Sequence, residues 1–304
     1  MTHREVFERL RGIFPPVVTP FDRRGKLEEA ALRANIRKYT GIGLSGILVA
    51  GSTGEAPHLT LRERLRVIEV ARAVVEPPEL LIAGTGLEST AQTLELSRDA
   101  AACGADAVLI VPPTYYKPMM RPDVLSAHFR RIADGVRIPV LVYSIPQYTG
   151  YRMDVAVLGR LSRHPNIVGI KESSGDFQFL QAILDNVGRN FRVLVGSASI
   201  LVEGLKAGAA GAILGQSNFE PHLCIAIYEA FAQGDLRTAE RLQERLMILV
   251  REITAPLSIP GIKAALDLSG IRGGYPRPPL APVGPAARRK IAAALKHARQ
   301  GLDV

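Results

Sequence analysis

Short runs of apolar residues, many of them β-branched, recur at regular intervals along most of the chain. Most of these runs are continuously hydrophobic and do not alternate with polar residues, which is typical of strands buried on both faces of a parallel sheet. They predict eight strands, at positions 13–18, 46–49, 80–83, 107–111, 139–143, 167–170, 192–195 and 211–214.

Segments with helical periodicity lie between the predicted strands. The apolar stripe of segment 61–76 consists of Leu61, Leu65, Ile68 and Val75. Ser89 with Gln92 three residues later predicts a capping box at the start of the next helix, and Gly104 predicts the end of that helix. Strands and helices are therefore expected to alternate.

Eight strands alternating with helices predict an α/β protein, a (β/α)8 TIM barrel, and not an open doubly wound sheet. No GxGxxG motif follows the first strand, so the chain lacks the main signal of a dinucleotide-binding fold. We expect residues 1–235 to form the barrel that carries the active site. Residues 236–304 are expected to form a C-terminal helical extension packed on it, with helices near 237–253, 260–269 and 285–300 separated at Pro256, Pro260 and segment 273–285.

The composition is that of an ordinary globular protein, with 47% apolar and 22% charged residues among 304. No apolar run approaches the roughly 18–20 residues that a membrane span needs. The charged N-terminus lacks the apolar core of a secretory signal, and the two cysteines, Cys103 and Cys224, lie far apart. These features predict a cytoplasmic protein without a membrane partner.

The formal net charge of +9 raises the question of nucleic-acid binding. The basic residues are spread along the chain, however, and the densest patch, Arg288–Lys290, is expected on a solvated helix face. Aromatic residues make up 6% of the chain and tryptophan is absent, which leaves little material for stacking on bases. We therefore expect no nucleic-acid partner, and a basic surface that attracts small anionic substrates.

Candidate chemistry is concentrated at the carboxyl ends of the predicted strands, where barrel enzymes hold their active sites. Lys171 follows an apolar strand, and burial there would lower its pKa and favour Schiff-base formation; an exposed lysine at a strand end is the alternative. Tyr143 ends the adjacent strand and is a candidate proton relay, or else a buried structural tyrosine.

Ser52 and Thr53, followed by Gly54, could cradle a carboxylate with hydroxyl and backbone N–H groups, or could form a local turn. The six histidines show neither HxH nor HExxH spacing, so no metal site is expected.

Several motifs together resemble the successive motifs of the class I, Schiff-base aldolases, the N-acetylneuraminate lyase and dihydrodipicolinate synthase superfamily. They are GSTGEAPHLTLRER (51–64), IAGTG (82–86), PPTYYKP (112–118), VYSIPQYTG (142–150), HPNIVGIKESSGD (164–176), GSA (196–198) and SIPGIKAALDLSG (258–270). The resemblance covers nearly the whole chain.

The resemblance implies that Lys171 forms an imine with pyruvate or another 2-oxo acid, without a metal or other cofactor. It implies that Tyr143 shuttles protons and that Thr53 links it to Tyr115 of a neighbouring subunit in a homotetramer built as a dimer of dimers. The implied substrate-binding residues are Ser52, Thr53, Gly54, Tyr148, Ser173, Gly196 and Ile213.

Within this superfamily the chain looks most like 4-hydroxy-2-oxoglutarate aldolase, which implies aldol cleavage of a 2-oxo acid or the reverse condensation. Dihydrodipicolinate synthases usually carry an arginine where this chain has Tyr148, and a phenol cannot form a bidentate ion pair with a carboxylate. The alternatives are dihydrodipicolinate synthase, an aldolase or dehydratase for 2-keto-3-deoxy sugar acids, and a catalytically silent barrel that acts as a binding protein.

Feedback inhibition by lysine is expected to be absent. The positions that match the effector contacts of lysine-inhibited synthases are occupied by Ala56, Pro57, Arg64, Glu88 and Thr114, and Arg64 would repel a cationic effector.

Overall fold

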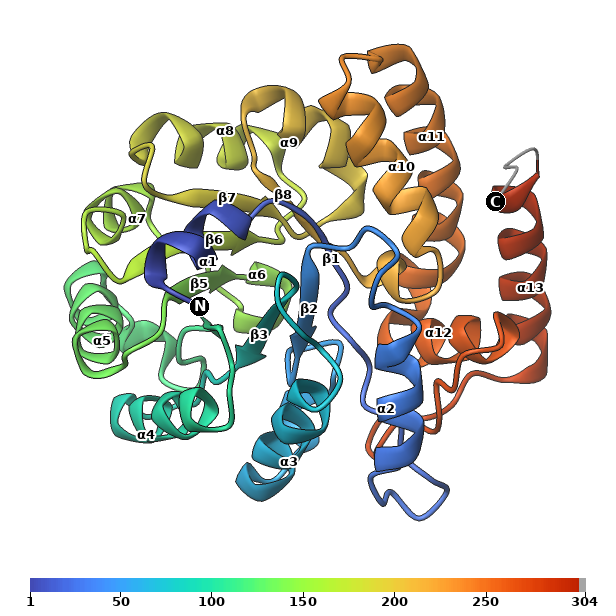
Figure 1. Ribbon diagram of the computed structural model, residues 1–304, viewed down its shortest axis with the longest axis horizontal. Helices are drawn as coiled ribbons and strands as arrows, with labels where there is room; N and C mark the ends of the chain where they lie inside the picture. Colours follow the sequence, from blue (N-terminus) through green and yellow to red (C-terminus); the bar gives the residue numbers. More distant parts are fainter. Residues whose placement is uncertain (301–304) are drawn as a thin grey trace.

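Each predicted apolar run overlaps a strand in the computed structural model, which describes residues 1–300 (Figure 1). The strands are β1 (Gly12–Phe14), β2 (Gly46–Val49), β3 (Leu80–Gly84), β4 (Ala107–Ile110), β5 (Val140–Ser144), β6 (Ile167–Glu172), β7 (Arg192–Val195) and β8 (Gly211–Ile213). All seven neighbouring pairs are parallel, in the order β1-β8-β7-β6-β5-β4-β3-β2. A parallel bridge between Pro16, two residues after β1, and Leu48 of β2 closes the ring, so the predicted (β/α)8 barrel is confirmed.

Helices surround the barrel, as the alternating pattern predicts (Figure 1). They are α2 (Glu29–Arg37), α3 (Leu61–Arg72), α4 (Thr90–Ala102), α5 (Pro122–Gly135), α6 (Pro146–Thr149), α7 (Val155–Leu161), α8 (Phe177–Asn186), α9 (Leu201–Ala207) and α10 (Pro221–Ala232). The helix α1 (His3–Arg9) closes the amino-terminal end of the barrel. Its Val6 belongs to the cluster of side chains that fills the barrel, and its Phe7 ring lies against Arg192, the first residue of β7. The candidate active-site residues lie at the opposite end of the barrel, at the carboxyl ends of the strands.

Local details differ from the predictions for identifiable reasons. The first strand stops at Phe14 because Pro15 and Pro16 have no N–H to donate to a sheet. Leu61, predicted on the buried stripe, is exposed at the first position of α3, and Arg64 is buried in that helix instead. Ser89 does precede α4, but its side chain makes no capping hydrogen bond, so the predicted capping box is wrong.

The C-terminal extension is helical, as predicted. The helix α11 (Leu236–Leu249) continues through a π-helical turn, Val250–Thr254, into α12 (Ala255–Leu268), which is itself broken between Pro256 and Pro260, as the prolines predict. The chain kinks at Ser258, whose φ of 48° and ψ of −135° are not helical. The last helix, α13 (Pro285–Arg299), packs on α11 and α12.

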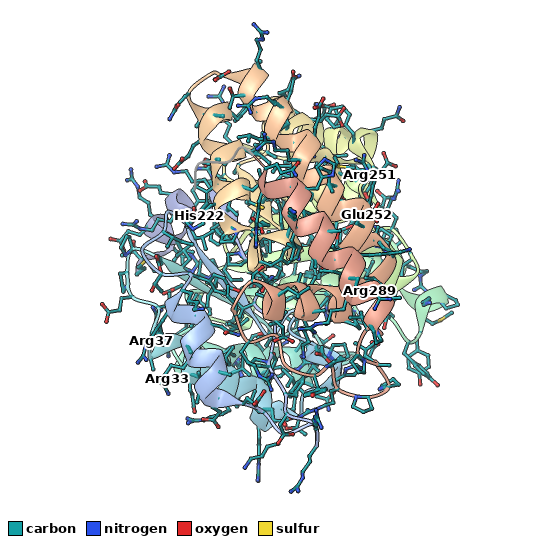
Figure 2. All side chains as sticks on the ribbon, turned by 90° about the vertical axis from the view of Figure 1, so that its right-hand side faces the viewer. Arg33, Arg37, His222, Arg251, Glu252 and Arg289 are labelled. Atoms are coloured by element: carbon teal, nitrogen blue, oxygen red, sulfur yellow. The ribbon has the colours of Figure 1, made fainter. Side chains whose placement is uncertain are left out.

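The outer face of these helices is solvated, and Figure 2 shows Arg251 and Glu252 on the turn after α11 and Arg289 on α13, all three exposed. The patch Arg288–Lys290 is exposed on α13, as predicted. No helix within residues 1–300 is long and apolar enough to cross a membrane.

A buried ion pair joins the extension to the loop after β2. Nζ of Lys263 in α12 lies 2.5 Å from Oε1 of Glu55, and the two side chains are 1% and 0% exposed. The ammonium group also donates to the carbonyl oxygens of Thr19 and Tyr275, each at 2.8 Å. Burial lowers the pKa of Lys263, and the Glu55 carboxylate acts in the opposite direction. Lys263 therefore joins α12 to the loop after β2, to the segment after β1 and to the segment that follows α12.

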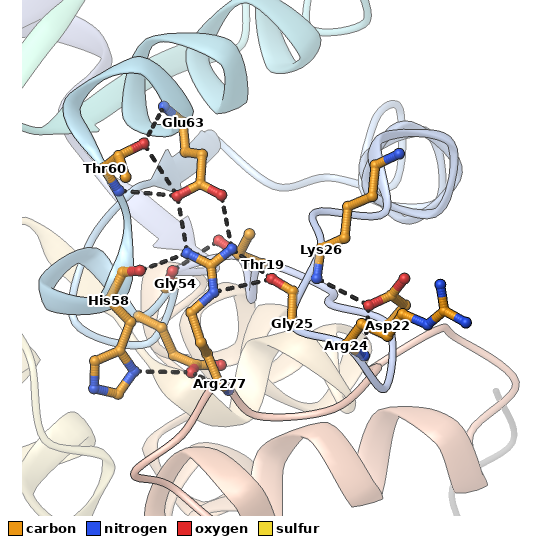
Figure 3. A network of polar contacts seen from close by, with 11 residues as sticks. Thr19, Asp22, Arg24, Gly25, Lys26, Gly54, His58, Thr60, Glu63 and Arg277 are labelled. Carbon is orange, nitrogen blue, oxygen red and sulfur yellow. Dashed lines mark hydrogen bonds and ion pairs between the residues drawn. The ribbon is translucent and has the colours of Figure 1, made fainter.

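A second set of contacts holds the segment before α13 against the same loop (Figure 3). The guanidinium of Arg277 binds both carboxylate oxygens of Glu63 in α3, at 2.7 and 2.8 Å. It also donates to the carbonyls of Gly25 and His58, while its backbone N–H donates to Glu55 at 2.8 Å. The Arg277 guanidinium lowers the pKa of Glu63 to about 2.

We predict that Lys263→Ala lowers the free energy of unfolding by about 3–5 kcal/mol, because it leaves the Glu55 carboxylate buried without its cation. Lys206→Ala is the matched control, since Lys206 and Glu240 form an exposed pair at 2.9 Å whose loss should cost less than about 1 kcal/mol. Denaturant titration of both variants at one protein concentration measures the difference. Equal losses in the two variants would contradict the importance of the buried pair.

Candidate active site

Lys171 and Tyr143 are brought together by the register of two neighbouring parallel strands. They occupy paired positions in β6 and β5, so both side chains point to the same side of the sheet. The Lys171 ammonium nitrogen lies 4.4 Å from the centroid of the Tyr143 ring. Both residues are buried, and both line a cavity of about 500 Å³ at the mouth of the barrel.

Burial changes the acid–base properties of both groups. It lowers the pKa of Lys171 to about 7, so a large share of the amine is neutral at physiological pH. Burial also raises the pKa of Tyr143 to about 12, opposed by interactions with the hydroxyls of Ser52 and Ser173. A neutral amine is a nucleophile, and a protonated phenol beside it can give and recover a proton.

Most of the residues predicted for substrate binding line this cavity. Ser52 and Thr53 come from the turn after β2, Ser173 from the end of β6, Gly196 from the end of β7 and Ile213 from β8. A Cβ on Gly196 would lie 1.9 Å from Oγ of Ser173, so only glycine lets the two strand ends approach this closely. Tyr148, on α6, also lines the cavity, and its hydroxyl lies 3.1 Å from Oγ of Ser258.

Two predicted residues lie away from the cavity. Gly54 does not line the cavity, and its carbonyl accepts a hydrogen bond from the Thr19 hydroxyl at 2.7 Å, which links the turn after β2 to the segment after β1. Tyr115 is 78% exposed on the segment after β4, and its backbone N–H donates to Glu88. The proposed relay from Tyr143 through Thr53 to a neighbouring Tyr115 stays a prediction.

The C-terminal extension contributes a large part of the lining, and no motif in the sequence predicts this. Val250, Thr254, Ala255, Ser258, Ile259 and Ile262 line the cavity. Gln147 and Gln216 line it as well, and Gln216 donates to the Thr254 hydroxyl at 2.7 Å. Hydrophobic periodicity gave no signal for these residues, because they reach the site only through the kink and packing of α12.

A second cavity of about 600 Å³ adjoins the first and shares Ser52, Ile145, Tyr148, Ser258 and Ile259 with it. Five positions carry the prediction that lysine does not inhibit the enzyme. Four of them line this second cavity: Pro57, Arg64, Glu88 and Thr114. The Arg64 guanidinium is engaged by the carbonyls of Ala56 and Gly86, at 2.7 and 3.2 Å.

No cluster of three or more potential metal ligands occurs among residues 1–300. The reactive groups at the barrel mouth are instead a desolvated lysine, a tyrosine and two hydroxyl residues. These groups are those that a class I aldolase, an enzyme of the lyase class, needs to form an imine with its substrate.

Comparison with known proteins agrees with this class. Residues 9–298 match the model of the dihydrodipicolinate synthetase family, and the chain belongs to that family. A 4-hydroxy-tetrahydrodipicolinate synthase of Methanothrix thermoacetophila is 35% identical over 92% of this chain and 94% of its own length. The family uses a lysine Schiff base with pyruvate and no metal or other cofactor.

Two solved structures show the same fold over nearly the whole chain. Dihydrodipicolinate synthase from Aquifex aeolicus is 32% identical, with a TM-score of 0.89 over 97% of this chain and 100% of its own. YagE, a prophage protein of this family from E. coli K12 whose structure is in complex with pyruvate, is 28% identical, with a TM-score of 0.90 over 95% and 99%. None of these three relatives is named 4-hydroxy-2-oxoglutarate aldolase, so the comparisons do not support that finer prediction.

We predict that the rate of imine formation with pyruvate rises roughly tenfold per pH unit below pH 7 and levels off above it. The reason is that the neutral fraction of Lys171 increases up to its pKa of about 7. Trapping with cyanoborohydride at fixed pyruvate measures this rate, and a Lys171→Ala variant gives the background from other lysines. A midpoint near 10 would show that the amine is not desolvated.

We predict that Tyr143→Phe lowers kcat by about 10²–10⁴-fold while the fold is retained, because the ring packing stays and only the proton-carrying hydroxyl is lost. Tyr151→Phe is the control. Tyr151 also makes a hydrogen bond, to the carbonyl of Pro113 at 2.8 Å, but it does not line the cavity. Steady-state kinetics and thermal unfolding of both variants make the comparison, and a Tyr143→Phe enzyme within a few-fold of wild type would remove the proposed relay.

Proposed function

We propose that the protein is a pyruvate-dependent lyase that makes or breaks a carbon–carbon bond of a 2-oxo acid through an imine with Lys171. The observation that carries this proposal is the buried Lys171 amine above the Tyr143 ring, in a cavity lined by Ser52 and Thr53. The hydroxyls of these two residues are suited to hold the carboxylate of the 2-oxo acid.

In the proposed reaction the neutral Lys171 amine attacks the 2-oxo carbon, water leaves and a protonated imine forms. In the cleavage direction, removal of a proton from the C4 hydroxyl breaks the C3–C4 bond, releases an aldehyde and leaves an enamine. Protonation of the enamine at C3 and addition of water then release pyruvate. In this proposal Tyr143 carries these protons.

A second candidate is 4-hydroxy-tetrahydrodipicolinate synthesis from pyruvate and aspartate semialdehyde. The name of the similar Methanothrix thermoacetophila enzyme favours this reaction for the present chain. Tyr148 argues against it, since it occupies the position at which such synthases usually carry an arginine. The predicted cleavage of 4-hydroxy-2-oxoglutarate is one member of the wider class and is not singled out by any of these observations.

We also propose that the protein is a homotetramer of the cytoplasm. The segment after β4 exposes a group of large side chains, Tyr115, Tyr116 and Met119. A subunit interface there would cover them and bring Tyr115 toward a neighbouring site, as in the homotetramer that the resemblance implies. Both cysteines are free thiols, which suits the reducing cytoplasm.

We predict that reduction in the presence of pyruvate attaches a pyruvyl group to Lys171, seen as a mass increase of one peptide, and abolishes activity. One preparation is then assayed for pyruvate release from a panel of 2-oxo acids and for condensation of pyruvate with aspartate semialdehyde, with and without millimolar lysine. We expect faster release from a 2-oxo acid, unaffected by lysine. An unmodified Lys171 would exclude the mechanism, whereas faster condensation with aspartate semialdehyde would favour the second candidate and keep the mechanism.

A further inference from the structure

The charge of the cavity restricts what the enzyme can bind beyond the pyruvyl group. Lys171 is the only acidic or basic side chain among the lining residues of the described chain. Its amine is consumed when the imine forms, and the 2-oxo acid already brings one carboxylate to Ser52 and Thr53. A second carboxylate would lose its hydration without gaining a permanent cation, which is costly in a partly buried site.

The cation of the adjoining cavity does not supply this charge. Arg64 lines that neighbouring space and not the cavity of Lys171, and its guanidinium donates to the backbone carbonyls of Ala56 and Gly86. The net positive charge of the chain attracts anions over long distances, but it places no donor in the cavity.

The outer part of the cavity is instead rich in uncharged hydrogen-bonding groups. They are the side chains of Gln147, Tyr148, Ser173, Ser197, Gln216, Thr254 and Ser258. Ser173 is buried beside Tyr143, with which its hydroxyl interacts, and it lines the cavity. A substrate hydroxyl can form hydrogen bonds with uncharged groups of this kind without the cost of burying a charge.

Ser258 and Tyr148 lie where the two cavities meet, since both residues line both spaces. The 3.1 Å contact between their hydroxyls connects α6 of the barrel with α12 of the extension. Ser258 holds a left-handed φ of 48°, a conformation that costs energy in a residue other than glycine and that is often found at functional sites. The kink therefore brings the Ser258 hydroxyl against the Tyr148 hydroxyl.

We propose that the aldehyde partner is uncharged and carries hydroxyl groups, and that Tyr148 and Ser258 determine this specificity by hydrogen bonding to its chain. The intact substrate is then a 2-oxo acid with a hydroxylated, uncharged tail. The cavity of about 500 Å³ lies in the ordinary range for a small-molecule site and leaves room for such a tail. This proposal rests on the Schiff-base function proposed above and specifies its substrate class.

The test compares aldehydes in the condensation with pyruvate: glyceraldehyde, with two hydroxyls; propionaldehyde, with none; and succinate semialdehyde and glyoxylate, each with a carboxylate. We expect kcat/KM for glyceraldehyde to exceed that for each of the others by at least about tenfold, since a site built for hydroxyls rejects compounds that leave its polar groups unpaired. Higher kcat/KM for either carboxylate-bearing aldehyde would overturn the proposal.

Variants test the two residues directly. Tyr148→Phe and Ser258→Ala should each lower the ratio of kcat/KM for glyceraldehyde to kcat/KM for propionaldehyde about 3–10-fold, as expected for the loss of one neutral hydrogen bond. Tyr148→Arg should lower the preference for glyceraldehyde and raise kcat/KM for succinate semialdehyde. Ser126→Ala and Gln233→Arg, on α5 and at the end of α10, are matched controls outside both cavities.

Pyruvate trapping at Lys171 separates the two levels of the proposal. If trapping occurs in wild type and in all variants but the aldehyde preferences do not change, the role of Tyr148 and Ser258 is wrong and the Schiff-base function stands. If wild type forms no adduct with pyruvate, the proposed function itself fails.

Discussion

The buried ion pair between Lys263 and Glu55 is the contact on which the architecture of the site depends. Glu55 ends the turn that carries Ser52 and Thr53, and Lys263 lies in the helix that carries Ser258 and Ile259. Because a charge buried without its partner is very costly, the two groups hold the barrel loop and the C-terminal extension in one arrangement. Arg277 reinforces this arrangement through Glu63 and the Glu55 carboxylate. The extension is therefore a wall of the active site as well as a support for the barrel.

The second constraint is the strand register, which decides the reactivity of the site. A shift of one residue between β5 and β6 would turn Tyr143 or Lys171 to the other face of the sheet. On the observed face, burial lowers the pKa of Lys171 to about 7 and keeps Tyr143 protonated. The same burial that makes a charged lysine unfavourable makes its neutral amine available for an imine with pyruvate, so stability and reactivity are coupled at this position.

Membership of the family and substrate choice depend on different parts of the molecule. The features shared with relatives lie at the strand ends, where the imine chemistry takes place, and they are compatible with cleavage and with condensation. The outer part of the cavity is formed by α6, by the segment after β8 and by α12, and it contains uncharged polar groups. Similarity to the relatives described above, at 28–35% identity, therefore indicates the imine chemistry more directly than it indicates the aldehyde partner.

The amino-acid sequence by itself determined the barrel, the order of its strands and the position of Lys171, Tyr143, Ser52 and Thr53 at their ends. Continuous apolar runs and local motifs report on nearest neighbours along the chain, and parallel strands align their carboxyl ends whatever the details of packing. Only the tertiary structure decided that Gly54 does not line the cavity, that the break in α12 falls at Ser258 and that Ser258 meets Tyr148. The contacts of Gly54 and Ser258 join residues 35 and 110 positions apart in the chain, and no local pattern encodes such contacts.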